Sequence, residues 1–306
     1  MILYFVTIIL LILLAPILHS FIKVVKMRLL FKRPISIFQN YRDILKLFKK
    51  ETIISEETSA ITRFAPFLVL SPLIILMFFL PPIASGVFYV KFVDAFTITG
   101  LISLSTFFLM LLGLDSASSF GGMGSSREAF IAALVEPAMI LTIFSISLIA
   151  GDLGIGQAGV NLAHHFPKEH MSSFLFAAIS FFILLIAENG RIPVDNPETH
   201  LELTMIHEAM ILDLSGVYLA LIEIASSIKF VIFSSLFVSL FLPFGLNYAL
   251  PISVGIFVFK LFFIGALIAI IETNTAKLRL FKVPNLLAIS MVFGFLSLIT
   301  FYILGA

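Results

Sequence analysis

The sequence predicts an all-α, polytopic membrane protein with about eight transmembrane helices in a single membrane domain, residues 1–306. Hydrophobic residues make up 60% of the chain and charged residues 12%, with a mean hydropathy of +1.15. Soluble domains average about 45–50% apolar and about 25% charged residues. The second observation is a series of apolar segments that are long enough to cross a bilayer. The third is an uneven distribution of Lys and Arg between alternate loops.

Eight segments reach the length of roughly 20 residues that a bilayer core of about 30 Å requires. They are residues 1–22, 64–86, 93–114, 129–150, 171–188, 214–242, 251–272 and 284–305. The first has no basic region or small-residue cleavage site, so we expect a membrane span and not a signal peptide. The sixth is long enough to tilt or to project beyond the bilayer. An even number of spans places both termini on the same side.

The Lys and Arg residues predict the orientation, because cytoplasmic loops carry an excess of them. Residues 23–63 hold ten of the 19 in the chain. Alternate loops on the same side add five more, whereas the opposite side has only Lys91 and Lys168. We therefore expect both termini to lie outside, and the chain to be a multi-pass protein of the cell inner (cytoplasmic) membrane.

Residues 23–63 form a basic cytoplasmic loop, and residues 38–50 within it have the pattern of an amphipathic helix. Its apolar stripe consists of Ile44, Leu45, Leu47 and Phe48. Two compatible interpretations remain open: an interfacial helix lying on anionic lipid, or a docking surface for a soluble partner. The candidate docking residues are Arg42, Asp43 and Lys46.

The next cytoplasmic loop, residues 113–130, contains three closely spaced glycines, which predict a flexible or tightly turned segment. Ser126 is a candidate N-cap for a helix that begins near Arg127. That helix would carry Glu136 into the fourth span. A lone Glu within a span is a functional candidate; the alternative is a structural Glu bonded to a neighbouring hydroxyl or lysine.

Several classes of function are excluded. The chain has no cysteine, so it cannot ligate an iron–sulfur cluster through thiolates. Its net charge of +1 gives no case for nucleic acid binding. The histidines in the outer loop 151–170 lack a ligand framework, so we expect a solvated loop and no metal site.

The segment from Glu188 to Glu223 holds an unusual concentration of acids for a membrane protein. Seven of the 18 acidic residues lie there: Glu188, Asp195, Glu198, Glu202, Glu208, Asp213 and Glu223. Clustered carboxylates repel one another, which raises their pKa values and spreads their titrations. Such a row suits a proton path. The alternative, a solvated loop with structural salt bridges, does not account for the charged residues inside the spans.

Asn196 and Pro197 predict the start of a helix within this segment. If it continues to Asp213, then Glu198, Glu202 and Asp213 lie within roughly 60° of one another. Farther along, Lys229 and Lys260 fall inside apolar spans, where we expect each to pair with a carboxylate.

The run AENGRIPVDNPETHLEL, residues 187–203, resembles the cytoplasmic loop of the membrane subunit that joins the two arms of respiratory complex I, known as its subunit 1. The matching residues are Ala187, Glu188, Arg191, Pro193, Asp195, Glu198, Glu202 and Leu203. Val194 replaces the usual Phe, and His200 stands where complex I commonly has Glu. The approach to Asp213 is about three residues longer than in complex I.

Other stretches resemble the hydrogenase-like branch: the membrane subunit of group 4 [NiFe] hydrogenases and formate hydrogenlyases, of the hydrogenase-4 type. They are GLDSASSFGGMGSSREA with the following EPA, FQNYRDILKLFKKE, and LFLPFG at residues 240–245. The resemblance covers essentially the whole chain. It implies a non-catalytic membrane anchor on which iron–sulfur and large catalytic subunits dock, with a polar path leading to antiporter-like membrane subunits.

The resemblance assigns roles to individual residues. The proton-path candidates, including the two lysines inside spans, are Glu136, Glu188, Asp195, Glu198, Glu202, Glu208, Asp213, Glu223, Lys229 and Lys260. Arg127 and Arg191 would organise the acidic cytoplasmic coupling loop, residues 188–213, or the docked subunit.

The chain itself would bind no cofactor, since the complex would carry its iron–sulfur clusters and a NiFe centre on other subunits. The alternative is complex I proper, with a quinone chamber beneath the same loop. A stand-alone carrier is a third possibility, against which stands the lack of an inverted repeat of broken helices.

Overall fold

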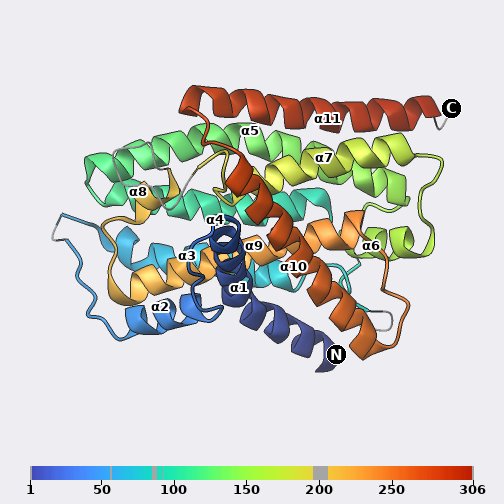
Figure 1. The fold of residues 1–306 in the computed structure, drawn as a ribbon. Helices are drawn as coiled ribbons and strands as arrows, with labels where there is room; N and C mark the ends of the chain where they lie inside the picture. The colour runs from blue at the N-terminus through green and yellow to red at the C-terminus, as the bar shows by residue number, and fades with distance from the viewer. Residues whose placement is uncertain (1, 56, 85–87, 92, 196–205, 305–306) are drawn as a thin grey trace.

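The computed structural model describes residues 2–55, 57–84, 88–91, 93–195 and 206–304 (Figure 1). Within these ranges the regular structure is helical, with no strand, so the predicted all-α class is confirmed.

Eight helices are long and apolar enough to cross a membrane, as the sequence predicts. They are α1 (Ile2–Leu29), α3 (Ala60–Met77), α4 (Ala95–Asp115), α5 (Ser119–Ala150), α7 (Met171–Glu188), α9 (Gly216–Phe241), α10 (Leu250–Asn274) and α11 (Val283–Leu304). The most deeply buried is α9, which packs against α1, α3 and α7 in the middle of the bundle. Figure 1 shows α5, α7 and α11 running side by side on one flank.

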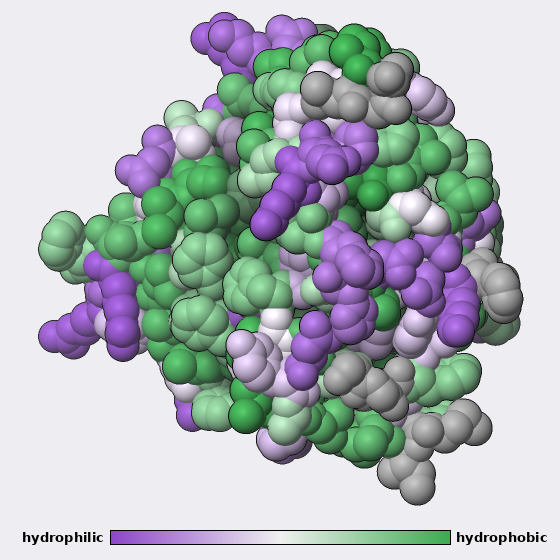
Figure 2. All heavy atoms as spheres, turned by 90° about the vertical axis from the view of Figure 1, so that its right-hand side faces the viewer, coloured by the Kyte–Doolittle hydropathy of each residue, from purple (hydrophilic) through white to green (hydrophobic). Residues whose placement is uncertain are grey.

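Four short helices lie at the two ends of the bundle. They are α2 (Gln39–Phe48), α6 (Ile155–His164), α8 (His207–Ile211) and the 3-10 turn η1 (Leu280–Lys282). In Figure 1, α2 and α8 lie toward one end, and α6 lies at the other end with both chain ends. Figure 2 views the end that carries α6, where hydrophilic residues gather with hydrophobic surface around them. Which end faces the cytoplasm stays a prediction.

The glycine-rich stretch after α4 is helical, so the expectation of a flexible or tightly turned loop is wrong. Helix α5 begins at Ser119, and the Ser118 side chain, not that of Ser126, caps it by accepting from the Gly121 amide. The glycines serve close packing: a Cβ on Gly124 would lie 2.9 Å from the carbonyl oxygen of Ile206. Helix α8 can therefore rest directly on α5.

The amphipathic helix predicted within residues 38–50 is confirmed as α2. Two contacts of Asn40 tie it to the bundle. The backbone amide of Asn40 donates to Ser20 Oγ of α1 at 3.0 Å, and Asn40 Nδ2 donates to Ser227 Oγ of α9 at 3.2 Å. Leu45 and Phe48 remain exposed on the outer face. The helix start predicted at Asn196 and Pro197 lies outside the described residues.

Helix α11 is the least buried of the eight spans, and a seam of hydroxyl groups joins it to α7. Ser180 Oγ of α7 lies 2.7 Å from Thr142 Oγ1 of α5 and donates to the Ser290 carbonyl of α11 at 2.8 Å. One step farther along, Ser297 Oγ donates to the Ser173 carbonyl at 2.8 Å. Small hydroxyl residues let helices approach closely in a membrane, where polar groups also join them.

We expect Ser180→Ala to destabilise the protein by about 0.6 kcal/mol, and at most about 1.7 kcal/mol, the range measured for hydrogen bonds between membrane helices. Ser71→Ala, at an exposed position of α3, is the matched control. Unfolding in mixed micelles measures both. Equal stability of the two variants would show that the seam contributes nothing.

Candidate functional site

A polar cavity of about 110 Å³ lies among α1, α7, α8, α9 and the loop after α7. Its lining residues are His19, Lys23, Glu188, Asn189, Gly190, Arg191, Asp195, His207, Glu208, Ile211, Ile222, Glu223, Ser226 and Lys229. Most are ionisable, which is costly within a membrane protein and marks a functional site.

The loop that follows α7 turns back sharply and brings its charged residues to the cavity. Glu188 ends α7, and Gly190 follows with a φ of 56°, in the left-handed region that favours glycine. The Arg191 carbonyl then accepts hydrogen bonds from the amides of Val194, at 2.8 Å, and Asp195, at 3.3 Å. The side chains of Arg191 and Asp195 are buried as a result.

Two of the cavity carboxylates face a lysine. Lys229 Nζ lies 3.0 Å from Glu188 Oε1, and Thr106 Oγ1 lies 3.4 Å from each of these atoms. Lys277 Nζ lies 2.7 Å from Asp195 Oδ1. The second oxygen of Asp195 accepts from the amide of Ile206 at 2.9 Å, immediately before α8. These pairs fix the two acids in place, because breaking a buried pair would leave a buried charge uncompensated.

Glu208 and Glu223 also line the cavity, but neither forms an ion pair within the described part of the chain. Burial, with the Glu223 carboxylate nearby, raises the pKa of Glu208 to about 7. Burial and the positive charge of Lys229 lower the pKa of His207 to about 4. Near neutral pH, the cavity thus holds a neutral histidine and a carboxyl group that gains and loses a proton readily.

A smaller cavity, of about 10 Å³, continues this cluster toward α5. Glu128 of α5 lines it together with Glu188, Asp195 and His207. A volume of this size is comparable with the space that one water molecule needs, about 10–15 Å³. The two cavities share Glu188, Asp195 and His207, so polar surface extends from α1 to α5.

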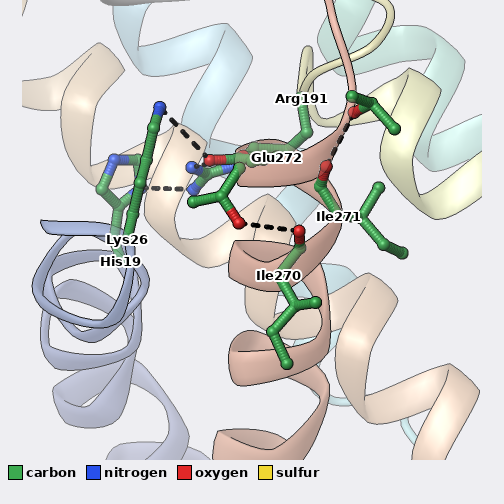
Figure 3. A network of polar contacts seen from close by, with 8 residues as sticks. His19, Lys26, Arg191, Ile270, Ile271 and Glu272 are labelled. Atoms are coloured by element: carbon green, nitrogen blue, oxygen red, sulfur yellow. Dashed lines mark hydrogen bonds and ion pairs between the residues drawn. The ribbon is translucent and has the colours of Figure 1, made fainter. Parts of the chain in front are cut away.

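Arg191 forms the centre of a polar network that joins the loop after α7 to α1 and α10 (Figure 3). Its Nη1 lies 3.5 Å from Glu272 Oε1 at the end of α10, and Glu272 Oε2 lies 3.6 Å from Lys26 Nζ of α1. Arg191 Nη2 lies 3.3 Å from His19 Nδ1. A guanidinium group only donates, so Nδ1 of His19 is the acceptor. The guanidinium also stacks over the Phe230 ring, 5.1 Å from its centroid.

The structure brings together six of the residues that the sequence proposes for the site. Glu188, Arg191, Asp195, Glu208, Glu223 and Lys229 all line the main cavity. Glu198 and Glu202 lie outside the described residues. The roles of these residues stay predictions.

Other proposed residues lie apart from the cavity. Glu136 is half-buried in α5. Asp213 is exposed and lines a separate pocket of about 10 Å³ beside residues 53–58. Arg127 is half-buried on α5, next to Glu128. The proposed docking residues of α2 are exposed, and one of them, Asp43, accepts a local hydrogen bond from Gln39 Nε2 at 2.9 Å.

Lys260 differs from the expectation that it pairs with a carboxylate. Its Nζ donates to the carbonyl of Leu242 at 2.6 Å and to that of Phe244, and it lies 4.0 Å from the centroid of the Phe244 ring. These carbonyls belong to the C-cap residue of α9 and to the loop that follows it. The ammonium group therefore binds backbone carbonyls of this loop, at the opposite end of the bundle, close to the partial negative charge of the helix C-terminus.

Five residues of the site were not among the sequence candidates: His19, Lys23, Glu128, Glu272 and Lys277. A histidine inside the first apolar span was a visible signal for His19. Lys23 and Lys277 contribute to the loop charges that predict orientation, which conceals any individual role. Glu272 lies near the end of α10, where an acid is commonly solvated, and the sequence places Glu128 near a helix start because it does not reveal that α5 already begins at Ser119.

The family model described as NADH dehydrogenase matches residues 1–304. The chain belongs to the NADH dehydrogenase family. It is 32% identical to hydrogenase-4 component C of Escherichia coli (strain K12) over 282 residues, 89% of this chain and 86% of that protein. It is 26% identical to formate hydrogenlyase subunit 4 of the same organism over 291 residues, 94% of each.

Similarity also extends to complex I and to another respiratory complex. A subunit of the NADH-quinone oxidoreductase of Paraburkholderia xenovorans (strain LB400) is 28% identical over 253 residues, which are 76% of this chain and 68% of that protein. The fold is similar to a chain of the membrane-bound sulfane sulfur reductase, an archaeal respiratory membrane complex, with a TM-score of 0.81 and 16% identity. The likeness covers 96% of this chain and 98% of that one. The predicted resemblance to the complex I membrane protein family and its hydrogenase-like branch is confirmed.

The raised pKa of Glu208 can be tested by titration. Its pKa is raised to about 7, so it loses its proton as the pH rises through neutrality, while an ordinary Glu has already done so near 4.5. We expect a pH-difference infrared spectrum between about pH 6 and about pH 8 to show loss of a protonated-carboxyl band. Glu208→Gln should reduce that change. Its persistence at full size in the variant would assign the titration to another carboxyl.

Proposed function

We propose that this chain is the membrane-anchor and proton-path subunit of a membrane-bound, hydrogenase-like complex related to complex I. It would join a cytoplasmic redox arm to an ion-pumping arm in the inner membrane. The observation that carries the proposal is the main cavity, in which ion-paired acids surround the unpaired acids Glu208 and Glu223.

This division of the acids suits proton transfer. A carboxylate held by a lysine keeps its position, whereas an unpaired acid with a raised pKa can exchange a proton with water near neutral pH. Redox events beside residues 188–213 would change the protonation or hydration of Glu208 and Glu223. The smaller cavity then continues the polar surface to Glu128 on α5.

Helix α5 offers a route for the lateral relay. Glu136 follows Glu128 by eight residues on the same helix, which corresponds to a rise of about 12 Å. It is half-buried and has no ion pair within the described residues. We propose that it continues the path toward antiporter-like membrane subunits, whose proton or sodium movement the relay would drive.

The proposed partners follow from the relatives and from this chain's own residues. The names of the relatives are those of hydrogenase, formate hydrogenlyase and NADH-quinone oxidoreductase components. The chain has no cysteine, so iron–sulfur clusters and a NiFe centre would lie on subunits docked at the cytoplasmic face. Exposed Arg42 and Lys46 of α2, with Asp43 and Arg127, are the proposed docking residues.

The described lining of the main cavity favours the proton path over a quinone chamber, the alternative for complex I proper. A pocket for a quinone ring is expected to be lined mainly by apolar and aromatic side chains. Among the described residues that line this cavity, Ile211 and Ile222 are the only large apolar ones, and none is aromatic apart from the histidines. Water and protons suit such a lining better than a hydrophobic ring.

We expect Glu223→Gln and Glu208→Gln each to lower the number of ions pumped per electron in the assembled complex, and the double variant to lower it further. The amide keeps the size of the side chain but cannot carry a proton. The test measures ion uptake into inverted membrane vesicles against electron transfer. Glu202→Gln belongs to the same set, since the resemblance places Glu202 on the path.

Glu169→Gln is the control for this set, because Glu169 is exposed in the loop at the other end of the bundle. Unchanged pumping in Glu202→Gln, Glu208→Gln, Glu223→Gln and the double variants that include Glu223→Gln would remove the carboxylates from the mechanism. A loss of the complex itself is recognised separately, by co-purification of partner subunits through a tag on this chain.

A further inference from the structure

The end of α10 and the segment that leaves it, residues 272–278, contact the described part of the loop after α7 through ion pairs and a backbone hydrogen bond. Glu272 forms an ion pair with Arg191 at 3.5 Å. Lys277 forms an ion pair with Asp195 at 2.7 Å. Beside these two side-chain contacts, the Leu278 amide donates to the Pro193 carbonyl at 2.9 Å. We name this segment the α10 linker.

The two ion pairs have opposite polarity. At one, the linker supplies the acid and the loop supplies Arg191; at the other, the linker supplies Lys277 and the loop supplies Asp195. The pairs are five residues apart in the linker and four apart in the loop, and they run in the same direction. Exchanging the two contacts would bring like charges together, so the pattern specifies one register. Buried polar pairs are best known for this kind of specification.

Both loop residues that the linker holds are parts of the cavity wall, whereas the linker residues Glu272 and Lys277 do not line it. Arg191 carries the guanidinium that reaches His19, and its carbonyl accepts the two amide bonds that shape the loop. Asp195 accepts from the amides of Ile206 at 2.9 Å and His207 at 3.4 Å, and so holds the start of α8. Helix α8 bears Glu208.

We propose that Glu272 and Lys277 are positioning residues, and that the α10 linker is a clamp that sets the geometry of the 188–195 loop for coupling. The clamp acts through Arg191 on the wall near α1, and through Asp195 on the placement of α8. This proposal rests on the proposed function, because coupling is what the positioned loop serves. The proposal gives residues outside α7 and α9 a part in coupling.

The test replaces one linker residue in the full chain and isolates the complex through a tag on this chain. Lys277→Met removes the cation and keeps most of the side-chain length, and Glu272→Gln removes the acid. Lys282→Met is the matched control, since Lys282 lies five residues farther on, is exposed, and loses the same charge. Lys277→Arg is the conservative variant that should restore the pair with Asp195.

Two measurements are made on each complex: amide hydrogen exchange of residues 191–195 and 206–208, and ions pumped per electron. We expect Lys277→Met and Glu272→Gln to raise the exchange of the loop amides by about tenfold, because a buried pair is broken. The ions-per-electron ratio should fall in both. Lys282→Met and Lys277→Arg should match the unaltered complex in both measurements.

If the loop amides exchange hydrogen at the same rate in Lys277→Met as in Lys282→Met, the clamp is overturned, whatever the result for Glu223→Gln. Faster exchange with an unchanged ions-per-electron ratio would overturn the positioning role. In that case, a lower ions-per-electron ratio in Glu223→Gln would still support the proton path. An unchanged ratio in Glu223→Gln would contradict the proton path as well as the positioning role. A variant that fails to assemble is replaced by the Lys277→Gln variant, judged by the same exchange measurement.

Discussion

The buried carboxylate of Asp195 is the constraint on which the polar site depends. One of its oxygens faces Lys277, and the other accepts from the amides of Ile206 and His207 at the start of α8. Removing one partner from a buried ion pair costs about 3–5 kcal/mol, because the remaining charge is left in a medium that solvates it poorly. The contacts of Asp195 therefore hold together three separate segments: the loop after α7, the start of α8, and the α10 linker.

A division of labour among the acids follows from that constraint. Glu188, Asp195 and Glu272 each face a cation, and they hold the walls of the cavity in place. Glu208 and Glu223 are near enough to each other for the Glu223 charge to help raise the pKa of Glu208. Fixed charges around an unpaired acid create a site whose geometry persists while its protonation changes. An arrangement in which every acid was paired would be rigid but could not exchange protons readily.

Periodicity and composition predict the parts of the structure that depend on burial in a bilayer. The eight spans and the amphipathic helix α2 follow from runs and stripes of apolar residues, and the cluster after Glu188 follows from the cost of charge near lipid. Gly124 could not be interpreted in this way, since it allows close contact with α8, a distant segment. Glu272 and Lys277 escaped prediction for the same reason: pairing across about 80 residues leaves no local pattern.

The two lysines inside spans show that residue type alone does not identify the partner of a buried charge. Lys229 and Lys260 each occupy an apolar helix, and each needs a partner that compensates its charge. Lys229 pairs with the carboxylate at the end of α7, whereas Lys260 donates to backbone carbonyls just beyond the end of α9. Of the two, Lys229 is the lysine whose partner is a second titratable group, and it adjoins the polar cavity with its unpaired acids. A buried lysine therefore shows that a compensating partner lies nearby, but its residue type does not say whether that partner is a carboxylate, as for Lys229, or a backbone carbonyl, as for Lys260.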